Sequence, residues 1–342
     1  MLKSKNKLFV LVIISLFLSL IIFTNCDNNS SDSPPEIVIH CPECEKPAHT
    51  RTDAHTPQSV SSDWNQPIRL IEPVNSFCPE DAIEISADGN YLYFMFTEDL
   101  LDNLNPGQIL SQKNNTYRSK KTGGPGDFAE AVYFDLTGDA ASGSFDGELS
   151  FSPDGSTLYF HSNRAENTGY HHDPFINDYL DIYIADIVND KAQNIRNIGY
   201  PINTEYPDGE HAIHPDGISL YFTSMRPGGK GSSDIWVSTR NESLWTAPIN
   251  LESINTKYSE LQPAFTADGN TMYFSSDRDI HIGAAIYRSV CTDGIWGSPE
   301  LIIKGIVGEP SLTADGRYLY FVHVLTDESG LFDADVWYST RQ

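Results

Sequence analysis

The chain has 342 residues, of which 47 are acidic and 22 are basic, and its formal net charge at pH 7 is −25. A surface this negative repels a polyanion, so the composition excludes nucleic acid as a partner and leaves cations and neutral polymers open. The simpler interpretation of the charge is that scattered surface carboxylates keep the protein soluble.

The first 25 residues have the composition of a secretory signal peptide. Three lysines precede an apolar run from Leu8 to Phe23, and this stretch contains no Asp or Glu. Removing it takes away three of the 22 basic side chains and none of the 47 acidic ones, so the mature charge becomes −28.

The end of this stretch predicts a lipid anchor. Phe23-Thr24-Asn25-Cys26 resembles a lipobox, in which Cys26 receives a diacylglycerol lipid. Phe23 and Asn25 depart from the usual leucine and small residue, and the alternative is an uncleaved membrane anchor that leaves the same domain outside. We expect the chain to be lipid-anchored to a bacterial membrane, in the cell envelope, with its domain facing the periplasm or the exterior.

Residues 26–62 are rich in proline and polar side chains and show neither helical nor strand periodicity. They predict a disordered tether, which could hold the domain on the order of 100 Å from the membrane when extended. Cys41 and Cys44 form a Cys-x-x-Cys pair within it, with three histidines nearby. We favour a local disulfide there, a zinc site is the alternative, and no cofactor is predicted.

Beyond the tether the chain repeats itself five times. Each repeat places an Asp-Gly pair before a run such as Leu-Tyr-Phe. The aspartates are spaced 66, 62, 52 and 47 residues apart, and they are Asp88, Asp154, Asp216, Asp268 and Asp315. Because glycine accepts the positive φ of a tight turn, each pair predicts a hairpin of two antiparallel strands.

A third strand follows in each repeat, and a fourth carries a Trp-x-x-Pro pattern that begins at Trp245 and again at Trp296. Four strands per repeat predict a propeller blade. The last repeat ends at Gln342 without a fourth strand, but Trp64 begins the same pattern ahead of the first repeat. We therefore predict an all-β, five-bladed β-propeller of four-stranded antiparallel blades over residues 63–342, closed by residues 63–72 in the last blade.

The repeated Pro-Asp-Gly, Leu-Tyr-Phe-x-Ser-x-Arg and Asp-Ile-Tyr patterns resemble the PD40, or WD40-like, repeats of TolB-type propellers, over residues 63–342. The resemblance implies a propeller and an extracytoplasmic setting. The family is functionally mixed, since it includes translocation partners, domains fused to peptidases or peptidoglycan-binding modules, and lipoproteins. TolB itself usually has six blades and an added N-terminal domain. Neither is predicted here, so a Tol-Pal role is not carried over.

Acidic residues recur where the innermost strand of each blade begins. They are Glu80, Asp81, Glu148, Glu210, Glu260 and Glu309. Near the axis they would ring the mouth of the channel. There they could bind a cation or polyol, or form the catalytic pair of a glycoside hydrolase. The interpretation we favour is hydrogen bonding between repeats.

Three blades end their second strand in Ser-x-Arg, at Arg164, Arg226 and Arg278. These arginines could clamp a ligand carboxylate. Asp181 and Asp234 begin the third strand in two of the same blades, so pairs within a blade are the simpler prediction. Ala285 takes that place in the fourth blade, which leaves Arg278 freer to pair with Asp277 or Asp279 or to bind a ligand.

Long segments at residues 97–114, 162–178 and 326–333 join the second and third strands, and we expect the binding face there. The second contains Tyr170-His171-His172-Asp173, which could bind a metal but fits an ordinary solvated loop better. Cys78 and Cys291 are predicted to lie on opposite faces and not to bond.

Our leading hypothesis is a non-enzymatic binding or scaffolding module of the envelope, which engages a protein, peptide or glycan through the face of the long loops. The alternative is a carbohydrate-active enzyme, a glycoside hydrolase or lyase, that uses the carboxylates at the channel mouth.

Overall fold

The computed structural model describes residues 52–76, 79–96, 116–134, 136, 146–164, 166–168, 180–242, 244–327 and 330–342. The predicted signal peptide, the lipidation site Cys26, the Cys41–Cys44 pair, Cys78 and the segment 170–173 lie outside these residues. Within the described ranges, no helix has the length and apolarity needed to cross a membrane.

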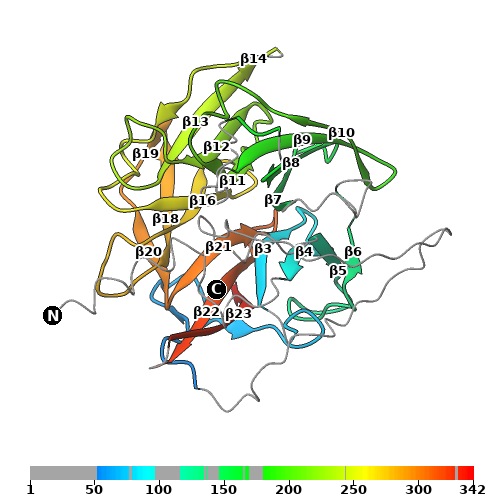
Figure 1. The fold of residues 1–342 in the computed structure, drawn as a ribbon. Coiled ribbons are helices and arrows are strands. Elements are labelled where there is room, and N and C mark those ends of the chain that lie inside the picture. The colour runs from blue at the N-terminus through cyan, green and yellow to red at the C-terminus, as the bar shows by residue number, and fades with distance from the viewer. Residues whose placement is uncertain are drawn as a thin grey trace.

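Five antiparallel sheets lie around a common centre, as predicted, and form a five-bladed propeller (Figure 1). In each blade the four strands follow one another from the axis outward. Blades one and two comprise β3 (Glu80–Ile85), β4 (Tyr91–Phe96), β5 (Thr116–Lys120), β6 (Val132–Tyr133), β7 (Asp146–Phe151), β8 (Thr157–Ser162), β9 (Asp181–Val188) and β10 (Lys191–Asn197).

Blades three and four have the same order with short added strands at their outer ends. Blade three comprises β11 (Asp208–Ile213), β12 (Ser219–Ser224), β13 (Asp234–Asn241) and β15 (Ile249–Asn250), with β14 (Leu244–Trp245) also pairing with β13. Blade four comprises β16 (Glu260–Phe265), β17 (Thr271–Ser276), β18 (Ala285–Thr292) and β20 (Glu300–Lys304), with β19 (Ile295–Trp296) also pairing with β18.

Blade five joins the two ends of the folded chain. It comprises β21 (Val307–Leu312), β22 (Tyr318–Asp327), β23 (Gly330–Thr340) and β2 (Ile68–Arg69). Ile68 is opposite Tyr338 and Arg69 is opposite Trp337 in the register of β2 and β23. The predicted closure by residues 63–72 is therefore confirmed.

The Asp-Gly pairs form the tight turns that the repeat predicts. Gly89 has a φ of 69°, and the equivalent glycines of the other four turns have similar values. Asp88 Oδ1 accepts hydrogen bonds from Ser86 Oγ at 2.6 Å and from the backbone N–H of Asn90 at 2.9 Å. Each turn thus satisfies its own polar groups with local partners.

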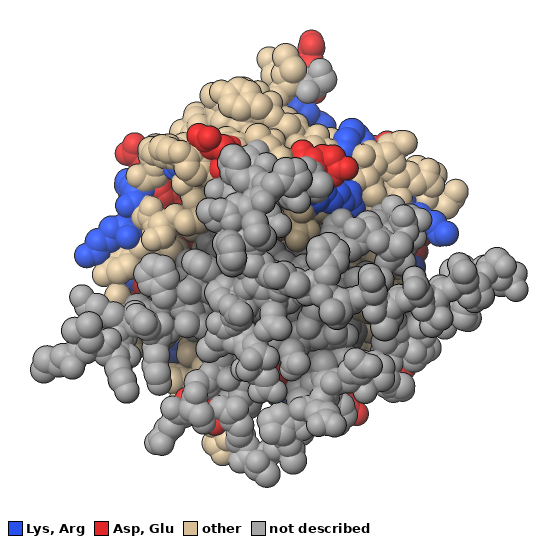
Figure 2. All heavy atoms as spheres, in the orientation of Figure 1, with Lys and Arg blue, Asp and Glu red and all other residues tan. Residues whose placement is uncertain are grey.

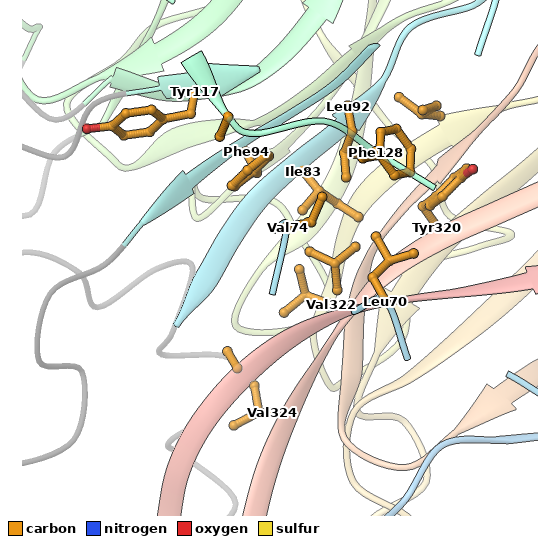
Figure 3. Close-up of a cluster of buried hydrophobic side chains, with 14 residues drawn as sticks. Leu70, Val74, Ile83, Leu92, Phe94, Tyr117, Phe128, Tyr320, Val322 and Val324 are labelled. Atoms are coloured by element: carbon orange, nitrogen blue, oxygen red, sulfur yellow. The ribbon is translucent and has the colours of Figure 1, made fainter. Parts of the chain in front are cut away.

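Each interface between blades is an apolar cluster built from the Leu-Tyr-Phe run. The phenylalanine packs within its own blade, and the tyrosine of the preceding blade packs beside it, as with Phe160 and Tyr93 or Phe222 and Tyr159. Figure 3 shows the interface where blade five meets blade one, with Tyr320 beside Phe128. Burial of such aromatic faces supplies much of the stabilising free energy.

The folded chain begins earlier than the predicted boundary at residue 63. β1 (Gln58–Ser59) pairs with the outer edge of β20, and Val60 N–H donates to Ile302 O at 3.0 Å. The described part of the predicted tether, residues 52–62, therefore lies on the propeller. The free edge of blade four supplies the backbone partners, which composition alone does not reveal.

The predicted loop at 326–333 is also corrected. β22 and β23 continue as a hairpin in which Thr326 is opposite Leu331 and Asp327 is opposite Gly330. This hairpin is longer than those of the other blades, because apolar residues continue on one of its faces, where Val324 and Ala334 are buried.

Candidate functional site

The innermost strands β3, β7, β11, β16 and β21 surround the axis (Figure 1). Each has a β-bulge at its third residue, where the register with the second strand shifts. These bulge residues all have positive φ, between 43° and 56°, and they are Ala82, Glu148, Glu210, Gln262 and Glu309. Because Ala82 has the same conformation without a functional group, the bulge is a property of the repeat.

The predicted carboxylates divide into two sets two residues apart. The first position of the innermost strand holds the predicted Glu80 and Glu260, and the bulge position holds the predicted Glu148, Glu210 and Glu309. The first position of the other three blades holds Asp146, Asp208 and Val307, of which the two aspartates were not predicted. Asp81 lies between the two positions and joins the bulge set through its contacts.

At the bulge position the carboxyl groups of different blades meet. Glu309 shares a hydrogen bond with Asp81 and another with Glu148, and Glu210 lies close enough to Glu148 to repel its charge. Asp81 is 3% exposed, Glu309 6% and Glu148 9%. We call Asp81, Glu84, Glu148, Glu210 and Glu309 the axial cluster.

Burial controls the charge of the axial cluster. It raises the pKa of Glu148 and of Glu309 well above the usual range, and the neighbouring carboxylates raise both further. Burial also raises the pKa of Glu84 to about 8, although the hydroxyl of Ser311 donates to it at 2.7 Å. A hydrogen bond between two carboxyl groups requires a proton, so the cluster holds protons at neutral pH.

At the first position the acids bond to groups of their own repeat. Glu260 accepts from Thr256 N–H at 2.6 Å, from Ser276 Oγ at 2.9 Å and from Arg278 at 3.2 Å. Glu80 accepts from the N–H of Ser76 at 2.7 Å and from its hydroxyl at 2.5 Å. Burial raises the pKa of Glu260, and these bonds offset part of that rise.

The predicted partners of the arginines are wrong. Arg164 pairs with Asp146 at 2.9 Å, Arg226 with Asp208 at 2.6 Å and Arg278 with Glu260 at 3.2 Å. The register of the innermost strand with the second strand sets these pairs, because the first residue of one faces the final serine of the other. Arg278 is thus no freer to bind a ligand than the other two.

The acids on the third strand, which we expected to hold the arginines, bind other groups. Asp181 accepts from Thr168 N–H and from Asn197 at 2.7 Å each. Asp234 accepts from the side chain of Asn250 at 2.9 Å. These bonds hold the third strand to the loop before it and to the outermost strand.

Each arginine also lies between two aromatic rings of its blade. Arg226 lies 4.9 Å from the ring centre of Phe222 and 5.5 Å from that of Trp236. Arg278 has the same relation to Phe274 and Tyr287, at 5.0 and 4.7 Å. The Phe-x-Ser-x-Arg and Asp-Ile-Tyr patterns therefore record one structural unit, held by ion pairing and cation–π contacts.

Sequence reasoning missed a second repeated device in the connections between blades. Asn203 accepts from Ile182 N–H and donates to Ile182 O, both at 2.9 Å. Asn255 holds Ile235 in the same way, and Asn75 holds Val336. The sequence carries this signal as a three-residue motif, an apolar residue followed by Asn and then by Ser or Thr. The Ser or Thr lies four residues before the first-position acid.

Acidic and basic side chains are interspersed on the part of one face that Figure 2 colours, over blades two, three and four. Among the described residues, no three or more His, Cys, Asp or Glu side chains are placed to hold a metal ion. Cys291 is a free cysteine, and its predicted relation to Cys78 lies outside the described residues.

Comparison with known proteins supports the fold alone. Neither a protein-family model nor a curated protein matches this sequence. A solved structure described as a glycoside hydrolase is 9% identical with a TM-score of 0.54, and the match covers 83% of this chain and 92% of that one.

Two TolB structures are also similar in fold. A putative TolB from Agrobacterium tumefaciens is 17% identical with a TM-score of 0.45, over 84% of this chain and 90% of that one. TolB from Acinetobacter baumannii is 15% identical with a TM-score of 0.42, over 78% of this chain. The match spans only 55% of the Acinetobacter chain.

Proposed function

We propose that this chain is a lipid-anchored propeller of the PD40 type in the cell envelope, and that it is a non-enzymatic binding or scaffolding module for a protein, peptide or glycan. Cys26 is the proposed lipid site, and residues 27–51 are the proposed tether. The strongly negative charge supports a partner other than nucleic acid.

The state of the predicted carboxylates carries this proposal. A glycoside hydrolase needs two carboxyl groups about 5 to 9.5 Å apart on either side of a sugar. Glu309 instead shares hydrogen bonds with Asp81 and with Glu148, and all three side chains are buried. Glu80 and Glu260 are held by hydroxyl groups, backbone N–H groups and an arginine.

We place the binding surface on the face where the connections between blades open. Tyr200 is 85% exposed in the connection from blade two to blade three. Tyr206 and Tyr258 are partly exposed at equivalent places in successive connections, each donating its backbone N–H to a threonine hydroxyl at 3.2 Å. Aromatic side chains with one polar end favour contact with peptides and sugars.

The test combines binding and turnover on the full-length chain. We expect glycan arrays and pull-downs of envelope proteins to capture a ligand, Tyr200→Ala to weaken that capture severalfold, and polysaccharide assays to give no products. Leu244→Ala, at an exposed residue in the hairpin of β13 and β14 on the opposite face, is the matched control for loss of an exposed side chain. Hydrolysis of a polysaccharide that a single change such as Glu148→Gln abolishes would contradict the proposal and favour the enzyme.

A further inference from the structure

Blade five departs from the charge arrangement of blades two, three and four. In those blades the first-position acid is opposite a serine of the second strand, as Asp208 is opposite Ser224. In blade five Val307 replaces the acid and His323 replaces the serine. A basic side chain therefore stands where blades two, three and four place a hydroxyl, and its own strand pair supplies no acid at the equivalent position.

The missing acid comes from the N-terminal segment. Asp53 Oδ2 lies 3.0 Å from His323 Nε2, and Asp53 Oδ1 accepts from the backbone N–H of Thr326 at 3.2 Å. Ala54 N–H donates to Thr326 O at 2.7 Å, and His55 Nδ1 lies 2.7 Å from the Thr326 hydroxyl. We call residues 53–57 the strap, since they bind the long hairpin of β22 and β23.

The partners of His323 define its protonation when the strap is docked. Its Nδ1 lies 3.2 Å from the carbonyl oxygen of Ile306, which can only accept. Burial opposes ionisation of Asp53, but the bonds from His323, His55 and Thr326 outweigh it and lower its pKa to about 2, so this carboxylate also only accepts. A neutral imidazole has one donor nitrogen, so both bonds form only when the ring carries two protons.

Other charged groups around His323 leave Asp53 as its counterion. Asp335 is opposite His323 across β22 and β23, but both its oxygens accept from Arg69 at 2.8 Å. The ring of Trp337 meets the imidazole edge to face at 5.7 Å. The His323 side chain is fully buried and that of Asp53 is 13% exposed, so water screens the pair little.

We propose that the strap is a pH-sensitive latch, docked on blade five while His323 is doubly protonated and loosened when the ring loses a proton. Loss of that proton removes the positive charge of the ring and one of its two donors, so the bond to Asp53 is weakened or lost. Asp53 then keeps only the backbone N–H groups of His55 and Thr326, and the Ile306 carbonyl keeps that of Val324. The latch determines where the proposed tether leaves the propeller. That consequence rests on the proposed function, whereas the docking itself does not.

Residue-resolved hydrogen exchange on the full-length chain tests the latch, with rates corrected for the intrinsic effect of pH. Histidine changes charge between about pH 5 and pH 8. Over that range we expect the protection of the Ala54 amide to fall about tenfold or more, the size of a lost hydrogen bond to a charged group. The Val60 amide follows β1 directly and donates to Ile302 O in β20, so it is the internal control and keeps its protection.

Two variants show whether the pH dependence of Ala54 protection comes from the pair of Asp53 and His323. Asp53→Asn should leave Ala54 weakly protected at both pH values, and His55→Ala should keep the pH dependence. Three outcomes would overturn the latch: no change of Ala54 protection with pH in the parent, an unchanged pH dependence in Asp53→Asn, or its loss in His55→Ala. None of these measurements depends on a ligand, so they fail or succeed separately from the proposed function.

Discussion

The first position and the bulge position of the innermost strands both carry acidic side chains, only two residues apart. The groups that surround the carboxyl group differ between the two positions. Asp208 at the first position has an arginine, a serine and a threonine as partners. The Glu309 carboxyl at the bulge position has the carboxyl groups of Asp81 and Glu148 and the backbone N–H of Ile83 around it. Burial raises the pKa at both positions, but only the first is compensated by a cation. A buried acid of the repeat therefore either forms an ion pair or keeps its proton, depending on the partner that the neighbouring strand supplies.

The largest effect should come from removing the cation at the first position. Arg226→Ala leaves Asp208, whose side chain is fully buried, without its counterion. We expect the free energy of unfolding in urea to fall by about 3–5 kcal/mol, the usual loss for one partner of a buried pair.

Arg196→Ala is the matched control for that change, because Arg196 pairs with Asp186 at 3.2 Å and both side chains are well exposed. Its midpoint of unfolding should stay within error of the parent. Equal losses of stability in the two variants would show that the buried first-position pair stabilises the fold no more than an exposed pair does.

The axial cluster should make stability depend on pH with the opposite sign to an ordinary ion pair. Acids whose pKa is raised in the folded state, such as Glu84 at about 8, hold protons that the unfolded chain releases near its ordinary pKa. Their contribution is complete at low pH and is lost as the pH rises to about 8. Each such group should lower the free energy of unfolding by about 1.4 kcal/mol per pH unit.

Urea titrations at several pH values between about 5 and 8 measure this slope. Glu84→Gln removes one titrating group, so the slope of the free energy of unfolding against pH should decrease by the contribution of that group. A free energy of unfolding that increases with pH over the same range would contradict a protonated axial cluster.

The smallest effect should appear when the same substitution, Glu→Gln, is made once at the first position and once at the bulge position. At pH 8, Glu260→Gln weakens an ion pair with Arg278 and should cost about 1–3 kcal/mol. Glu309→Gln removes an acid from a group of acids and should change stability by less than about 1 kcal/mol, in the stabilising direction. Urea unfolding of the two variants side by side measures the difference, and equal losses would remove the distinction between the positions.

Much of the fold follows from the sequence, because its signals are local. A hairpin needs glycine at one position, so five Asp-Gly pairs count the hairpins, and the unpaired pattern at Trp64 indicates how the ring closes. Residues of the candidate site could be found in the same way, since acids recur at fixed offsets from those turns.

The division of those acids could not be predicted. A bulge changes which residues face the axis, and bulges depend on pairing across the sheet. The same holds for the partners of Arg164, Arg226 and Arg278, which the register assigned to the innermost strand instead of the third.

The sequence by itself therefore determined the number of blades, their order and the closing strand, since each depends on residues close together in the chain. Tertiary structure alone decided which carboxyl groups share protons, which pair with arginine, and that Asp53 reaches His323 across 270 residues of chain. Charge at a buried site depends on the groups that folding brings near it, and those come from distant parts of the sequence.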